Sequence, residues 1–211
     1  MTARHRRELA GIPAMAFCVL LLSSTRLEIG AAASSPALVR SETVTSLPVT
    51  ALDGKPLDLA ARPGWKVVYF WSATCPCVRA CESFTLVPLA RRYQGQVSFY
   101  AVASNGYDLA LPSDRLARQV HQHHLPFPVL RDGRHLSARA LDARVTPQAF
   151  LLDPQNHVVF AGVPDDSRRY EAQNGHWGTS RTYLAQAIAQ ALARQLVTVP
   201  SVKDQGCIIA W

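Results

Sequence analysis

The sequence is poor in cysteine and methionine, with five Cys and two Met among 211 residues. Five cysteines are too few for a domain held together mainly by disulfides, and a chain of this length can bury a core without them. Although the net charge is +7, no run of basic residues alternates with aromatic ones, which argues against a nucleic-acid-binding protein. The apolar fraction of 48% and the charged fraction of 18% exclude a disordered or collagen-like chain.

The first 33 residues have the pattern of a secretory signal. Basic residues at positions 4–7 precede an apolar stretch from Leu9 to Leu22, and Ala31 and Ala33 supply an Ala-x-Ala step. The stretch is shorter than the roughly 20 residues that a membrane-spanning helix needs. We therefore expect residues 1–33 to be a signal peptide or, alternatively, an uncleaved N-terminal anchor. The protein is then periplasmic or exported, with a possible tether to the inner membrane.

Three segments follow the leader. Residues 34–46 are rich in Ser, Ala and Thr and are expected to be a linker, residues 47–199 to be one domain, and residues 200–211 to be a C-terminal tail. Strands are expected at 65–71, 97–103, 127–130, 148–153 and 157–162, after a hairpin over 49–59. Helices are expected at 76–93, kinked at Pro88, and at 114–125, 135–143 and 181–195. The order predicts an α/β sandwich whose central mixed sheet ends in an antiparallel hairpin.

Three cysteines, Cys75, Cys77 and Cys81, lie within seven residues after the strand expected at 65–71. Cys75 stands where this strand passes into a helix, and unpaired N–H groups at such a position favour an anion. The thiolate is the reactive form of cysteine. Pro76 suits the first turn of the helix because its missing N–H needs no partner there. Cys75 is therefore the expected nucleophile.

The second thiol of a redox pair has three candidates. Cys77 and Cys81 are four residues apart and share one helix face, whereas a bond between Cys75 and Cys77 would close a small, strained and easily reduced ring. Cys207 lies near the C-terminus, where the chain is expected to be mobile. It either swings in to resolve an oxidised Cys75 or only fixes the tail to the domain.

Three ordered motifs resemble the thioredoxin-fold redoxins and, within them, the peroxiredoxin-like group of the alkyl hydroperoxide reductase/thiol-specific antioxidant superfamily. They are Phe70-Trp71-Ser72-Ala73-Thr74-Cys75-Pro76, Thr146-Pro147-Gln148-Ala149-Phe150-Leu151-Leu152-Asp153 and Gly206-Cys207-Ile208-Ile209-Ala210-Trp211. The resemblance covers roughly residues 44–211. It implies a thioredoxin-like three-layer sandwich, Cys75 as the active cysteine, and Pro147 as a cis proline that faces it.

The sequence departs from the patterns of its relatives at several positions. The Cys-x-x-Cys pair of thioredoxins is absent, and Phe70 stands where peroxiredoxins have the Pro of Pro-x-x-x-Thr-x-x-Cys. Thr74 and Cys77 fit the rest of that motif, so either Cys75 or Cys77 is the cysteine that reacts with the substrate. In the terminal motif Ala210 replaces a lysine.

Histidines and acidic residues offer fewer candidates. His121, His123 and His124 are expected to form a solvated helix end rather than a metal site. Asp165 and Asp166 are expected to lie in a loop after the last strand, and the polar segment 165–180 that they begin is expected to be a flexible rim of the site. The Cys-x-x-x-Cys spacing of Cys77 and Cys81 is also that of copper-handling relatives of the redoxins, and thiolates suit copper(I).

These observations support three functional hypotheses. The leading one is an exported thiol–disulfide oxidoreductase in which Cys75 attacks a disulfide. The first alternative is a thiol peroxidase in which Cys75 is oxidised to sulfenic acid and another cysteine condenses with it. The second alternative is a copper-binding carrier. The expected partners are protein thiols or disulfides, or small peroxides, together with a separate reductant; neither nucleic acid nor a resident cofactor or metal is expected.

Overall fold

The computed structural model describes residues 43–203 and 205–210. The leader, its cleavage site and residues 34–42 of the expected linker therefore lie outside the described residues. Thr43 pairs with His157 in an isolated bridge, and Val44 is buried. Residues 43–46, which the sequence assigned to the linker, thus pack as part of the domain.

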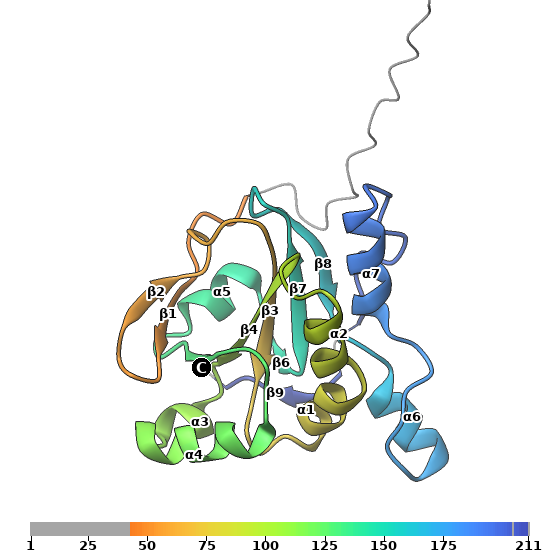
Figure 1. The fold of residues 1–211 in the computed structure, drawn as a ribbon. Helices are drawn as coiled ribbons and strands as arrows, with labels where there is room; N and C mark the ends of the chain where they lie inside the picture. Colours follow the sequence, from red (N-terminus) through yellow and green to blue (C-terminus); the bar gives the residue numbers. More distant parts are fainter. Residues whose placement is uncertain (1–42, 204, 211) are drawn as a thin grey trace, which may run out of the picture. The chain divides into compact units, whose positions relative to one another are not determined.

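A seven-stranded mixed sheet forms the centre of the domain, in the order β2-β1-β5-β4-β3-β7-β8 (Figure 1). Its strands are β1 (Pro48–Ala51), β2 (Pro56–Asp58), β3 (Trp65–Trp71), β4 (Val97–Ala103), β5 (Val129–Arg131), β7 (Gln148–Leu152) and β8 (Val158–Gly162). The three central strands β3, β4 and β5 are parallel, and every other pairing is antiparallel. Both predicted hairpins, β1–β2 and β7–β8, are confirmed. A separate pair joins β6 (Val145–Thr146) to β9 (Cys207–Ile208).

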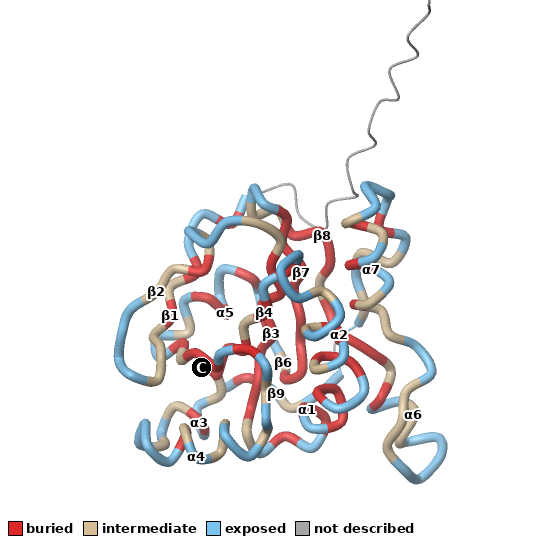
Figure 2. The backbone as a smooth tube through the Cα atoms, in the orientation of Figure 1, coloured by how far each residue is buried: buried red, intermediate tan, exposed pale blue. Residues whose placement is uncertain are grey.

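Strand β3 is buried on both faces, as its run of Val and aromatic residues predicts (Figure 2). Val67, Tyr69 and Trp71 point into one hydrophobic core, whereas Val68 and Phe70 point into the other. Because side chains alternate along a strand, β3 ties the two cores together. Cys75 follows the carboxyl end of this strand and is thereby held at the end of the central part of the sheet.

Helices cover both faces of the sheet. They are α1 (Pro76–Cys81), α2 (Val87–Arg92), α3 (Gly106–Ala110), α4 (Ser113–His123), α5 (Leu136–Leu141), α6 (Ser167–Asn174) and α7 (Tyr183–Leu192). Helices α1, α2, α4 and α7 contribute to the first core, and α5 contributes to the second. The arrangement is the predicted three-layer α/β sandwich. No helix within the described residues is long and apolar enough to span a membrane.

The helix predicted over 76–93 is interrupted before Pro88. Between α1 and α2 the chain makes a π-helical turn, η1 (Glu82–Leu86), and Pro88 lies in the first turn of α2. Because proline has no N–H to donate, it is tolerated at the start of a helix but disrupts its interior. The expected kink is therefore present as a change of helix type.

Part of the segment expected to be a flexible rim, residues 165–180, is helical, because residues 167–174 form α6. This helix is polar on nearly all sides, and only Ser167 is buried. It therefore has no apolar periodicity from which it could be predicted. The Asp165 carboxylate accepts a hydrogen bond from the N–H of Ser167 (2.9 Å) and fixes the start of the helix.

The expectation of a mobile C-terminal tail is wrong, since the described part of residues 200–211 is docked on the domain. The carbonyl of Pro200 accepts from the N–H of Ala161, and the N–H of Val202 donates to the carbonyl of Ala161. Further along, Ile209 is buried in the second core. Backbone pairing and this apolar side chain fix a segment for which the position at the end of the chain alone predicts mobility.

Candidate active site

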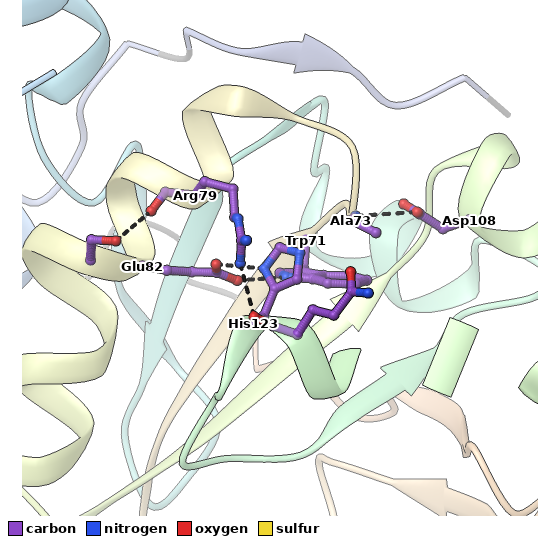
Figure 3. A network of polar contacts seen from close by, with 8 residues as sticks. Trp71, Ala73, Arg79, Glu82, Asp108 and His123 are labelled. Carbon is purple, nitrogen blue, oxygen red and sulfur yellow. Dashed lines mark hydrogen bonds and ion pairs between the residues drawn. The ribbon is translucent and has the colours of Figure 1, made fainter. Parts of the chain in front are cut away.

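Cys75 lies between the end of β3 and the start of α1. Its backbone is extended, with φ −80° and ψ 117°, and Pro76 occupies the first helical turn, as expected. The preceding loop is held by Asp108, whose Oδ1 accepts a hydrogen bond from the N–H of Ala73 (3.2 Å) (Figure 3). Asp108 is fully buried, and burial raises the pKa of its carboxyl. Helix α3 thus supports the loop that presents Cys75.

The sulfur of Cys75 is enclosed by residues that are distant in sequence. The Sγ atoms of Cys75 and Cys207 lie 2.6 Å apart, and the Cys75 thiol also faces the carbonyl oxygen of Thr146 at 3.4 Å. The Thr146–Pro147 peptide bond is cis, as the resemblance implied. Because Thr146 pairs with Cys207 across β6 and β9, the proline segment and the tail cover Cys75 together, and only 3% of Cys75 is exposed.

The neighbouring thiols determine the ionisation of Cys75. The pKa of Cys75 is lowered from 9.0 to about 5, and the largest cause is a hydrogen bond from the Cys77 side chain. Hydrogen bonds from Cys207, the Val78 backbone and Thr146 also lower this pKa, whereas burial raises it. Its hydrogen bond to Cys75 raises the pKa of Cys77. Burial and the contact with Cys75 raise the pKa of Cys207 to about 11. At neutral pH the site therefore holds one thiolate, at Cys75, beside two protonated thiols.

Cys81 has a different environment from the other cysteines of the cluster. It is fully buried in the first core, and burial raises the pKa of its thiol, with a further contribution from the Asp165 carboxylate. Within the described residues no hydrogen bond joins Cys81 to Cys75, and Cys75, Cys77, Cys81 and Cys207 are all free thiols. The structure brings Cys75, Cys77 and Cys207 together and places Cys81 in the core.

A buried polar network lies beside the cysteine loop (Figure 3). The Glu82 carboxylate accepts from Trp71 Nε1 (2.7 Å) and contacts His123 Nδ1 (2.6 Å). The side chains of His123 and Glu82 are each only 4% exposed, so the expectation that all three histidines are solvated is wrong for His123. His121 and His124 are exposed, as expected. The network joins β3, η1 and α4, and Glu82 directly follows the end of the cysteine-bearing helix α1.

Asp165 and Asp166 act as hydrogen-bond acceptors in their loop. Asp165 accepts from the Thr85 hydroxyl as well as from the N–H of Ser167. Asp166 accepts from three residues of the following loop, Thr179, Ser180 and Arg181. Among the described residues no group of three or more His, Cys, Asp or Glu side chains is arranged to hold a metal ion.

Sequence reasoning missed two residues that shape the site. Asp108 lies in a short helix without apolar periodicity, so nothing in the sequence indicates its burial. Gly206 allows the tail to approach β6, since a Cβ at this position would lie 2.3 Å from the Thr146 carbonyl oxygen. Its position beside Cys207 in the terminal motif is a signal that could have indicated this close contact.

Comparisons with known proteins agree with this architecture. Residues 41–161 match the AhpC/TSA family, whereas no curated protein matches the chain. A hypothetical protein from Sinorhizobium meliloti is 27% identical with a TM-score of 0.70, and the match covers 84% of this chain and 97% of that one. An uncharacterized conserved protein from Geobacillus kaustophilus is 28% identical with a TM-score of 0.67, covering 81% and 90%.

A third solved structure shares the fold at lower identity. It is described as a putative thiol:disulfide interchange protein DsbE from Chlorobium tepidum, and it is 18% identical with a TM-score of 0.52. The match covers 75% of this chain and 99% of that one. At this identity the likeness concerns the arrangement of strands and helices.

Proposed function

Because the chain belongs to the AhpC/TSA family and is a redoxin with the thioredoxin-like fold, we propose that it is a thiol–disulfide oxidoreductase. Cys75 is its nucleophile and Cys207 its second thiol. The observation that carries the proposal is the 2.6 Å separation of the two sulfur atoms. A disulfide bond is about 2.04 Å long, so the two residues need only a small approach to bond.

The reaction proceeds by two exchanges. The Cys75 thiolate attacks one sulfur of a substrate disulfide, and the other substrate sulfur leaves as a thiolate that takes a proton from water. Cys207 then loses its proton to water and attacks Cys75 Sγ, the second substrate sulfur leaves as a thiolate that takes up a proton, and a Cys75–Cys207 disulfide remains. Once Cys75 is in a disulfide its negative charge is gone, which removes one cause that raises the pKa of Cys207. The site itself thus promotes ionisation of Cys207 when Cys207 is needed.

Disulfide mapping after reaction with a single-disulfide peptide tests the proposal. The reduced protein should reduce the peptide and acquire a Cys75–Cys207 linkage, and Cys75→Ser should abolish the reaction. Cys81→Ser is the matched control, since a hydroxyl also donates to Asp165, and it should retain activity. Activity that survives in Cys75→Ser would contradict the proposal, as would rapid consumption of hydrogen peroxide without peptide reduction, which the peroxidase alternative requires.

The location of this activity is part of the proposal: the protein acts outside the cytoplasm after export. The basic and apolar pattern of residues 1–33 supports it. N-terminal sequencing of the protein from a periplasmic fraction should find a start near Ser34. An intact leader in the membrane fraction would support the anchored form, whereas full-length protein in the cytoplasm would contradict export.

A further inference from the structure

We infer that an external dithiol reduces the oxidised site by attacking Cys207, so that Cys207 and not Cys75 forms the mixed disulfide with the reductant. The inference rests on the proposed Cys75–Cys207 redox pair and names the sulfur at which the pair is regenerated. Three features carry it: the unequal exposure of the two cysteine residues, the docking of the strand that bears Cys207, and the difference in pKa between the two leaving groups.

The two cysteines differ in their access to a second molecule. Cys75 is 3% exposed and is covered by Cys77, Thr146 and Cys207. Cys207 is partly exposed, and its neighbours in sequence, Gly206 and Ile208, are exposed. An incoming thiolate must approach the sulfur that it attacks, so it reaches the more exposed cysteine, Cys207, more easily than Cys75.

In the reduced protein noncovalent contacts alone hold the strand that covers Cys75, so it can move aside when Cys75 attacks a substrate disulfide. Ile209 donates its N–H to the carbonyl of Arg144 (2.9 Å) and buries its side chain in the second core. On the opposite side, Asn105 Nδ2 donates to the carbonyl of Ile208 (3.3 Å). A disulfide to Cys207 adds a covalent bond to these contacts. The cover therefore stays closed for as long as the disulfide exists, and Cys75 remains out of reach of the reductant.

The chemistry of the two sulfurs favours the same direction of attack. Exchange is faster when the sulfur that leaves has the lower pKa. Attack on Cys207 expels Cys75, whose thiolate is stabilised by a hydrogen bond from Cys77. Attack on Cys75 would expel Cys207, whose pKa is raised by burial. Exposure and leaving-group quality thus agree on Cys207.

The complete step conserves atoms and electrons. The thiolate of the dithiol bonds to Cys207 Sγ, the Cys75–Cys207 bond breaks, and its electron pair stays on Cys75 as a thiolate. The second thiol of the reductant loses its proton to water and attacks the reductant sulfur that is bound to Cys207. Cys207 leaves as a thiolate and takes up a proton. The reductant becomes a disulfide, and the protein recovers one thiolate and one thiol.

A trapping experiment on the oxidised full chain tests this direction. The protein is oxidised, its Cys75–Cys207 disulfide is verified by peptide mapping, and 2-mercaptoethanol is added for a short time. Acid then stops the exchange by protonating Cys75 and precipitates the protein, which is redissolved at neutral pH in denaturant with excess N-ethylmaleimide to alkylate the free thiols at once, and the masses of the peptides are measured. We expect mercaptoethanol on Cys207 and the alkyl group on Cys75, with at least about a tenfold excess over the reverse pattern.

Each outcome of this experiment decides one of the two proposals. Mercaptoethanol mainly on Cys75, or equally on both cysteines, overturns the inference but leaves the Cys75–Cys207 pair intact. Failure to form that disulfide at the first step overturns the proposed function and the inference with it. Because the wild-type chain is used throughout, no variant has to fold for the result to be read.

Discussion

Among the single side chains of the site, Cys77 contributes most to the ionisation of Cys75. Its thiol donates the hydrogen bond that is the largest cause of the low pKa of Cys75, about 5. Cys77→Ala removes this donor, and we expect the pKa of Cys75 to rise by roughly one unit or more. The ultraviolet absorbance of the thiolate, followed against pH in the reduced protein, measures the change.

The pKa of Cys75 should rise, and not fall, in Cys77→Ala because the lost hydrogen bond stabilises the charged thiolate. A hydrogen bond to a thiolate favours ionisation, so its loss moves the midpoint of the titration towards the ordinary value for cysteine. Cys81→Ala is the control, because Cys81 does not hydrogen-bond to Cys75 within the described residues. An unchanged midpoint in Cys77→Ala would show that the thiolate is stabilised by other groups.

Glu82 is the residue on which the buried network depends. Glu82→Ala leaves Trp71 Nε1 and His123 Nδ1 without their buried acceptor, which we expect to lower the free energy of unfolding by about 3 kcal/mol. Urea denaturation of the reduced protein measures this loss. Glu171→Ala breaks a more exposed pair with Arg168 and should cost less than about 1 kcal/mol. Equal losses would show that the network contributes little to stability.

Sequence reasoning succeeded at residues whose environment is local. Cys75 and Pro147 lie in motifs whose neighbours identify them, and the structure gives the expected backbone at both positions. The contact between Cys75 and Cys207 joins residues 132 positions apart, so the sequence left open whether Cys207 approaches the site. His123 was misjudged because its partner, Glu82, lies on a different helical segment.

At the scale of elements, strongly apolar segments were predictable and short polar ones were not. Strand β3 and its neighbours β4 and β7 are rich in apolar residues, and their existence follows from composition, whereas the pairing of β3 with both of them does not. Helix α6 and the β6–β9 pair have no such pattern. They are stabilised by individual hydrogen bonds and by contacts with the rest of the domain, which a pattern search does not detect.

The β6–β9 pair offers a prediction about access to Cys75. In Gly206→Ala the new Cβ would lie 2.3 Å from the Thr146 carbonyl oxygen, a backbone atom that cannot rotate away. We expect β9 to loosen, iodoacetamide to alkylate Cys75 several-fold faster, and the Cys75–Cys207 disulfide to form more slowly. Mass spectrometry of timed samples measures both rates.

Gly133→Ala is the matched control for this variant, because an added Cβ there meets no atom within 4 Å. It should alkylate at the wild-type rate. If Gly206→Ala also reacts like wild type, the tail does not limit access to Cys75 and the burial seen at this residue has another origin.

At the scale of the whole molecule, oxidation replaces a stabilised thiolate with a long-range crosslink. A disulfide that closes a loop of this length stabilises a folded protein by about 5 kcal/mol in the chain-entropy description. The reduced protein has an opposing advantage, because its folded state lowers the pKa of Cys75 from 9.0 to about 5. The difference in the free energy of unfolding between the oxidised and the reduced protein therefore depends on pH.

The thiolate contribution is fully present above pH 9 and is lost as the pH falls through about 5, since only the folded protein holds the charge in that interval. At pH 7 it amounts to about 3 kcal/mol in favour of the reduced protein. We therefore expect the oxidised form to be more stable than the reduced one by about 2 kcal/mol at pH 7 and about 5 kcal/mol at pH 4.

Urea denaturation of both forms at the two pH values measures this change, and groups that titrate alike in both forms cancel in the difference. In Cys75→Ser, oxidising and reducing conditions should give the same stability at either pH, since the variant has neither the thiolate nor the crosslink. A wild-type difference that is independent of pH would mean that the folded reduced protein does not hold Cys75 as a thiolate. The proposed exchange would then lack its nucleophile, because a protonated thiol does not attack a disulfide.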